Sequence, residues 1–174
     1  MSTDPPLVLD TDFVSSFAWV NRMDILETLY TGRMLMLEEV EYELSKVKVL
    51  KSRVEASIAG GHIVRISMSA DSPEAAEFGR MHDSGRYGLG EAACMAYVTR
   101  HDGVVASNNL KDVKAFCTRN GKSLLTTAGV LLQAFDQGII TQSEPDDIWR
   151  GMLAKRRLLP AASFSAYLAN SGYR

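Results

Sequence analysis

Acidic side chains stand at four places in the chain where they could serve one metal-dependent reaction. They are Asp10, Glu43, Glu91 and Asp112. Carboxylates that a fold holds close together repel one another, and without a counter-ion some of them would have to stay protonated. A divalent cation relieves that repulsion, and an all-oxygen set of ligands suits Mg²⁺ or Mn²⁺ rather than zinc. Such an ion activates a water molecule and stabilises the charge that develops on a phosphodiester.

Other polar residues lie beside these acids. Thr11 and Asp12 follow the first acid directly, and Ser107, Asn108 and Asn109 follow an apolar run later in the chain. We expect Thr11 or Ser107 to bond to a carboxylate. We expect Asn108 or Asn109 to orient a water molecule or a phosphate. The alternative is structural, because Asp and Thr are also ordinary N-caps of helices.

Short apolar runs that alternate with helical patterns indicate which elements position these residues. The runs that predict strands are at 7–9, 34–37, 62–68, 104–106 and 123–126. The segments that predict helices are at 12–30, 38–59, 73–83, 89–100, 108–120 and 127–137. This alternation predicts an α/β protein with a mostly parallel sheet and helices on both faces. In such folds the site lies beyond the carboxyl ends of the strands, near a switch in strand order.

Two of the acids can be placed on their helices. Val40, Leu44 and Val47 form an apolar stripe in the second predicted helix, and Glu43 lies on the flank of that stripe. The other glutamates of this segment are expected to face solvent or to favour the helix N-terminus through its dipole. Small residues surround Glu91, so the start of its helix can approach the sheet closely.

The bulk composition excludes several classes of protein. The chain has 174 residues, of which 46% are hydrophobic and 23% charged, as in ordinary soluble globular domains. No apolar run approaches the roughly 20 residues that cross a bilayer, and the N-terminus lacks the layout of a signal peptide. A cytoplasmic protein without membrane contact is therefore expected. Cys94 and Cys117 are expected to be reduced core thiols.

The charge distribution bears on nucleic-acid binding. A net charge of -2 argues against a protein that coats nucleic acid through its overall charge. Local basic clusters exist nonetheless, and one of them contains Lys155, Arg156 and Arg157. These three side chains either contact the phosphates of RNA or form a solvated face of the protein.

Four motifs resemble those of the PIN-domain nucleases, in the same order along the chain. Residues 8–12 resemble the opening strand of that family, and residues 39–44 its second acidic element. Residues 89–92, Leu-Gly-Glu-Ala, are similar to the start of a helix in the Gly-Glu-Ala branch. Residues 126–132, closing on 138–140, resemble the last strand and helix of that branch.

The resemblance implies a single PIN-like domain over residues 1–140, with 141–174 as a helical extension packed on it. It implies a ribonuclease dependent on Mg²⁺ or Mn²⁺, in which Asp10, Glu43 and Glu91 hold the metal directly or through water. VapC-like toxin ribonucleases belong to this family. The partners it implies are therefore RNA, an antitoxin protein and a second copy of the chain.

One position departs from the family pattern. PIN domains usually carry Asp just after the fourth strand, where this chain has Asn108 and Asn109. In the predicted helix Asp112 would lie one turn beyond Asn108 and could complete the cluster. The rival hypothesis is a non-catalytic PIN-like module that binds RNA or protein and has a degraded metal site. In a third interpretation each acid serves only as a helix cap.

Overall fold

Five parallel strands form a single sheet in the computed structural model, which describes residues 4–172. The strands are β1 (Leu7–Leu9), β2 (Met34–Leu37), β3 (Ile63–Ile66), β4 (Val104–Ala106) and β5 (Leu124–Leu125). Their order across the sheet is β3-β2-β1-β4-β5. Every neighbouring pair is parallel. The predicted α/β class with a parallel central sheet is confirmed.

Ten helices flank this sheet within the described part of the chain. They are α1 (Thr11–Trp19), α2 (Met23–Tyr30), α3 (Glu38–Ser45), α4 (Lys48–Ala59), α5 (Pro73–Asp83), α6 (Leu89–Val98), α7 (Asp112–Arg119), α8 (Thr127–Asp136), α9 (Glu144–Ala154) and α10 (Phe164–Asn170). None of them is long and apolar enough to cross a membrane.

The strand order reverses at β1, the central strand. The chain first builds β2 and β3 on one side of it and later returns to build β4 and β5 on the other. In the register of β1 and β4, Leu9 lies opposite Ala106. The residues that follow them, Asp10 and Ser107, therefore meet at the carboxyl edge of the sheet. This is the switch point where ligands bind in open parallel sheets.

Two of the predicted helices are each divided in the structure. The segment 12–30 forms α1 and α2, because Asn21 between them has a φ of 57°, which a continuing helix cannot contain. The segment 38–59 forms α3 and α4, with Lys46 and Val47 between them. Val47 has an extended backbone there and precedes the new helix as its N-cap.

The helix predicted at 108–120 begins only at Asp112. The Asn109 side chain accounts for the delay, because its Oδ1 accepts hydrogen bonds from the backbone N of Lys111 at 3.1 Å and of Asp112 at 2.8 Å. Such side-chain bonds hold a turn in place of helix. The expectation that Asp112 lies one helical turn beyond Asn108 is therefore wrong.

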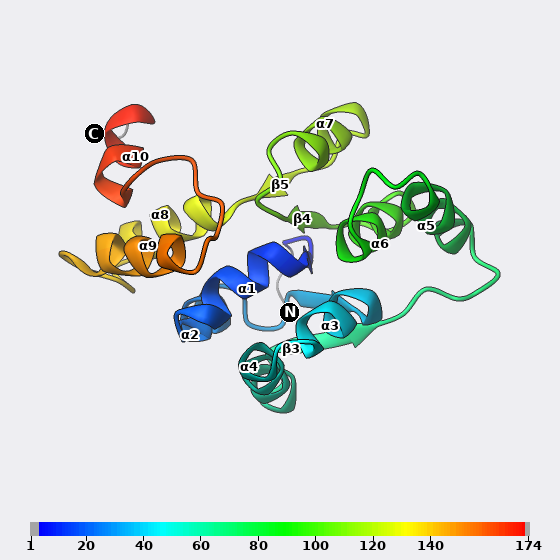
Figure 1. Ribbon diagram of the computed structural model, residues 1–174, viewed down its shortest axis with the longest axis horizontal. Coiled ribbons are helices and arrows are strands. Elements are labelled where there is room, and N and C mark those ends of the chain that lie inside the picture. The colour runs from blue at the N-terminus through cyan, green and yellow to red at the C-terminus, as the bar shows by residue number, and fades with distance from the viewer. Residues whose placement is uncertain (1–3, 173–174) are drawn as a thin grey trace.

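Contacts between elements place α3 between two groups of helices. On one side, α6 packs against β1, β2 and β4 and also contacts α5 and α7. On the other, α1 contacts α2, α4 and α9, and α2 contacts α8. Helix α3 contacts both α1 and α6. Figure 1 shows α5 and α6 on the right and α8, α9 and α10 on the left, with α1 between them.

The chain beyond residue 140 shares the core of the sheet. Trp149, Met152 and Phe164 belong to the same buried cluster as the strands. The Trp149 side chain is fully buried, and its Nε1 donates to the Ala161 carbonyl at 2.9 Å. The first three residues of the predicted domain 1–140 and the last two of the predicted extension 141–174 lie outside the described part of the chain.

Candidate functional site

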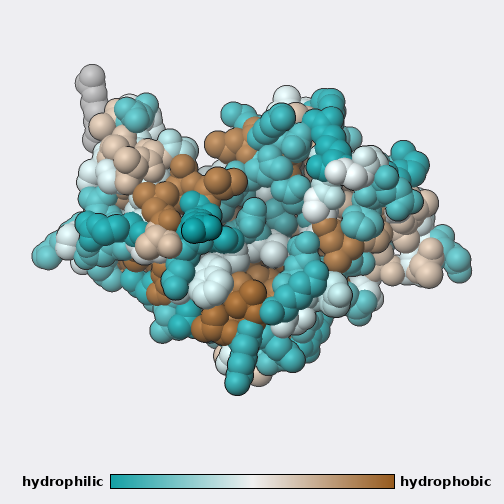
Figure 2. All heavy atoms as spheres, viewed as in Figure 1, coloured by the Kyte–Doolittle hydropathy of each residue, from teal (hydrophilic) through white to brown (hydrophobic). Residues whose placement is uncertain are grey.

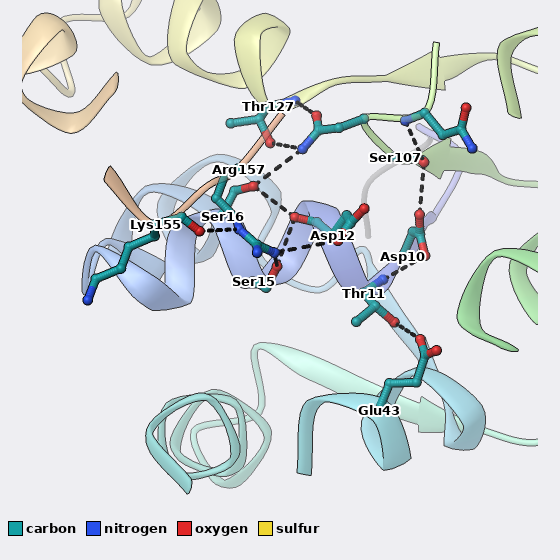
Figure 3. A network of polar contacts seen from close by, with 12 residues as sticks. Asp10, Thr11, Asp12, Ser15, Ser16, Glu43, Ser107, Thr127, Lys155 and Arg157 are labelled. Atoms are coloured by element: carbon teal, nitrogen blue, oxygen red, sulfur yellow. Dashed lines mark hydrogen bonds and ion pairs between the residues drawn. The ribbon is translucent and has the colours of Figure 1, made fainter. Parts of the chain in front are cut away.

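Asp10 lies at the carboxyl end of β1 and is the N-cap of α1. It is 2% exposed. Its Oδ1 accepts from the backbone N of Thr11 at 2.7 Å, and its Oδ2 accepts from Ser107 Oγ at 2.8 Å. Figure 3 shows both bonds. The carboxylate thus joins the ends of β1 and β4, and the expected bond from Ser107 to a carboxylate is confirmed.

The carboxyl group of Asp10 titrates far from its ordinary range. The pKa of Asp10 is raised from 3.8 to about 7, first by burial and then by the negative charges of Glu91 and Asp12. The hydrogen bonds from Ser107 and Thr11 act in the opposite direction. Asp10 and Glu91 therefore lie close enough to repel each other in a dry environment. A cation bound between acids would remove this repulsion.

Glu43 connects α3 to the starts of two other helices. Thr11 Oγ1 at the start of α1 donates a hydrogen bond to Glu43 Oε2, as Figure 3 shows. The backbone N of Gly90 at the start of α6 donates to the same oxygen at 3.2 Å. One glutamate oxygen thus joins three helices at the carboxyl edge of the sheet. The expected bond from Thr11 to a carboxylate is confirmed.

Gly90 makes this meeting of three helices possible. A Cβ at that position would lie 2.5 Å from Thr11 Oγ1 and 2.7 Å from Glu43 Oε2. Atoms at those distances overlap, so any larger residue would push α6 away from the other two helices. Gly90, one of the small residues around Glu91, is therefore required by this close approach.

Glu91 reaches the end of β4 through an amide. Asn109 Nδ2 donates to Glu91 Oε1 at 2.8 Å. The Oδ1 atom of Asn109 accepts hydrogen bonds from the backbone of the turn before α7. Both the nitrogen and the oxygen of this amide therefore have partners. Asn109 therefore positions Glu91. A direct contact from Asn109 to water or phosphate stays a prediction.

Glu39 also belongs to this cluster, although the sequence predicts that it faces solvent or favours the helix N-terminus. Its Oε2 is buried and has no hydrogen-bond partner among the described residues. Burial, and then the charges of four acids, raise the pKa of the buried Cys94 thiol. Those acids are Asp10, Glu39, Glu43 and Glu91. The spacing of Glu39 and Glu43 puts both on one face of α3, but the same spacing occurs on a solvated face, so the sequence alone does not assign Glu39 to the cluster.

Asp112 is engaged in an ion pair with Arg86. Arg86 Nε donates to Asp112 Oδ1 at 3.0 Å, and this guanidinium keeps the pKa of Asp112 below its ordinary value. The ion pair sits partly in solvent, with the Arg86 side chain 54% exposed. A fourth ligand at Asp112 would have to leave Arg86, and this role stays a prediction.

Asn108 uses its side chain to join the end of β4 to the start of α8. Its Oδ1 accepts from the backbone N of Thr127 at 2.9 Å. Its Nδ2 donates to Thr127 Oγ1 at 2.9 Å and to Ser16 Oγ at 3.3 Å. Both ends of the amide are therefore occupied by the protein itself.

The three C-terminal cations have different surroundings. Arg157 turns inward, where its guanidinium donates to Ser15 Oγ at 2.9 Å and lies 3.5 Å from Asp12 Oδ1. The Lys155 ammonium lies 5.0 Å from the centre of the Trp19 ring. Arg156 is exposed and forms no ion pair within the described part of the chain. Only Arg156 is thus fully available to a phosphate.

A cavity of about 600 Å³ opens beside Glu91. The starts of α7 and α8, the segment 158–160 and α10 surround it. It is lined by Asp12, Glu91, Asn108, Asn109, Leu110, Lys111, Thr126, Ala128, Leu158, Leu159, Pro160 and Tyr167. A substrate bound there would reach the acids from one side.

The donor set suits a hard cation, but the side chains do not converge as they are placed. Within residues 4–172, no three His, Cys, Asp or Glu side chains could hold one metal ion together. The hydrogen bonds explain this, since Glu43 is turned to Thr11 and Glu91 to Asn109. The candidate donors are all oxygen, and the buried Oε2 of Glu39 lacks a partner. The chemistry therefore fits Mg²⁺ or Mn²⁺, and binding requires glutamate side chains to rotate.

Fold and site together define an α/β domain with an acidic cluster at the switch point of a parallel sheet. Comparison of the chain with protein-family models and with curated proteins finds no match.

Proposed function

We propose that this protein is a metal-dependent ribonuclease of the PIN type. The observation that carries the proposal is the carboxyl group of Asp10, which is buried at the switch point with a pKa of about 7. A carboxyl group whose charge is disfavoured beside another acid is typical of a functional site. Its position at the ends of β1 and β4 supports the family resemblance of the sequence.

Asp10, Glu43 and Glu91 are the proposed metal-holding residues, and Glu39 is a fourth oxygen donor within the same cluster. Mg²⁺ or Mn²⁺ bound there would supply an activated water and stabilise charge on the phosphodiester. The chain's own residues prepare this site. Ser107 and the Thr11 backbone fix the plane of the Asp10 carboxylate, and Asn109 restrains Glu91.

A second candidate function is a non-catalytic PIN-like binding module. The observation in its favour is that the two residues available for the fourth acid position are already engaged. Asn108 bonds Thr127 and Ser16, and Asp112 pairs with Arg86. A chain that had lost its metal would keep the fold and the cavity while losing turnover. The toxin role, with an antitoxin partner, and a homodimer both stay predictions.

Cleavage of single-stranded RNA separates the two functions. We expect cleavage by wild type in Mg²⁺ or Mn²⁺ and none in excess EDTA. Asp10→Asn and Glu91→Gln should each lower the rate at least a hundredfold, because each removes a charge that holds the metal. Asp71→Asn is the matched control, since Asp71 is an exposed acid outside the cluster. It should cleave like wild type.

A thermal unfolding series gives a readout besides activity. Saturating Mn²⁺ should raise the Tm of wild type and of Asp71→Asn by several degrees, because a ligand that binds only the folded state stabilises it. Asp10→Asn should show a much smaller shift. RNA binding without cleavage, and without any Mn²⁺ shift, would establish the binding module. Equal cleavage by all four proteins would reveal a contaminant.

A further inference from the structure

The cavity beside Glu91 has an apolar wall that the acidic cluster does not require. Leu110 is 48% exposed and Leu158 is 70% exposed, and both line this cavity. Leu159, Pro160 and Ala128 extend the wall. Figure 2 shows apolar side chains gathered over the segment between α9 and α10, next to a hollow in the surface. Exposed leucines that converge on one cavity mark a surface that binds an apolar group.

An aromatic ring also lines the cavity and is firmly held. The Tyr167 ring lies 5.6 Å from the Trp149 ring and 6.3 Å from the Phe164 ring, measured between centroids. Trp149 and Phe164 are buried in the main core. Tyr167 is therefore a rigid part of the wall. Because this side chain is already ordered, a ligand that binds it loses little side-chain entropy.

The opposite end of the cavity is polar, but few of its groups are free to form hydrogen bonds with a ligand. Asn108 and Asn109 have partners on both ends of their amides. Thr126 Oγ1 already accepts from the backbone N of Gly129 at 3.1 Å. Glu91 and Asp12 are left as acids at this end, and Lys111 is an exposed cation in the lining.

We infer that this cavity receives one nucleobase of the RNA, adjacent to the bond that is cleaved. The inference rests on the proposed function, because it places the phosphodiester at the acidic end. The base lies against the wall of Leu110, Leu158 and Tyr167. A volume of about 600 Å³ suffices for a base and its ribose. Lys111 lies where it can meet a neighbouring phosphate.

The arrangement also determines how selective this contact is. Every base has a flat apolar face, and stacking on such a wall tolerates all four of them. Selection among bases needs hydrogen bonds to their edges, and the amides that could form them are already engaged. The base is therefore held by contact with its face, with little preference for its identity.

An apolar protein segment would match the leucines but not the whole cavity. Such a segment would bring backbone carbonyl groups, which need donors, to an end lined by carboxylates and by amides that are already engaged. A nucleotide instead has an apolar face on one side and a phosphodiester on the other. This division matches the apolar wall, and the phosphodiester reaches the acidic end through a cation bound to those carboxylates.

Binding of intact and base-free RNA tests the inference. The affinity of wild type for oligouridylate and for an abasic backbone of the same length would be compared in Ca²⁺, which also takes oxygen ligands, and the strands would be checked afterwards to confirm that neither was cleaved. We expect the intact strand to bind about tenfold tighter. In the double variant Leu110→Ser, Leu158→Ser this ratio should fall toward one. Both leucines are exposed, so the fold should not change.

Tyr42→Ser, Val64→Ser is the matched control, because these residues are 60% and 50% exposed and lie outside the cavity. This control should keep the wild-type ratio. An unchanged ratio in the leucine variant would overturn the inference, as would equal losses for both RNAs. If wild type binds neither RNA, or does not distinguish them, the wall receives something else, with an apolar protein segment as the alternative. Cleavage in Mg²⁺ or Mn²⁺, assayed separately, decides the proposed function.

Discussion

The carboxyl group of Asp10 makes the stability of the apo protein depend on pH. Its pKa is about 7 in the folded protein against an ordinary 3.8, so the folded state holds this proton more tightly than the unfolded state. Between these two pH values the unfolded state binds fewer protons, and the free energy of unfolding falls as pH rises. We expect this group to remove a few kcal/mol at most over the window.

Urea unfolding in EDTA measures this effect at pH 4.5 and 6, which lie inside the window of about 4 to 7, and at pH 7.5, which lies just above it. In Asp10→Asn this proton no longer contributes to the change of the free energy of unfolding with pH. The variant should therefore become more stable relative to wild type as pH rises. Asp71→Asn should follow wild type. A constant difference between Asp10→Asn and wild type at all three pH values would contradict the raised pKa.

The different surroundings of Arg156 and Arg157 separate RNA binding from stability. Arg156→Ala should weaken RNA binding and reduce the slope of log affinity against log salt by about one, with Tm unchanged. Arg157→Ala should lower the free energy of unfolding by about 1 kcal/mol, because it removes the bonds to Ser15 and Asp12. Salt titrations of binding and urea titrations would be run on both variants. If Arg156→Ala leaves the salt slope unchanged, the basic cluster is a solvated face.

At the scale of elements, the start of α6 depends on a position without a side chain. Gly90→Ala should destabilise the fold by roughly 1–3 kcal/mol, because the new methyl group overlaps Thr11 and Glu43. Gly79→Ala is the matched control, since Gly79 is inside α5 and a Cβ there meets nothing within 4 Å. That control should stabilise by roughly 0.5–1 kcal/mol through helix propensity. Urea unfolding gives both values, and a stabilising Gly90→Ala would refute the close approach.

At the scale of the whole molecule, the C-terminal helices and the sheet should unfold together. Trp149 of α9 is fully buried in the core that contains the strands. Trp149→Ala should therefore lower the free energy of unfolding of the entire protein by about 3–5 kcal/mol. Circular dichroism and tyrosine fluorescence should report one shared transition. Two separate transitions in wild type would show instead that the extension folds independently.

The sequence by itself determined the elements whose signals are local. Apolar runs located β1, β2 and β4 at their observed bounds, since buried parallel strands are apolar on both faces. Ser72 and Pro73 begin α5 where the pattern predicts it. The acids at the ends of strands followed as well, because parallel strands bring their carboxyl ends to one edge. For this reason the sequence alone predicts a bond from Thr11 or Ser107 to a carboxylate.

Only the tertiary structure decided which partner each polar group has. The pairing of Asp112 with Arg86 and the bond from Asn109 to Glu91 join residues that are far apart in the chain. The tertiary structure also decided the burial of Glu39, whose spacing fits a solvated helix as well as a buried one. Hydrophobic periodicity reports which face of an element is buried. It does not report which of several nearby donors a carboxylate will accept from, because that depends on how the packed elements meet.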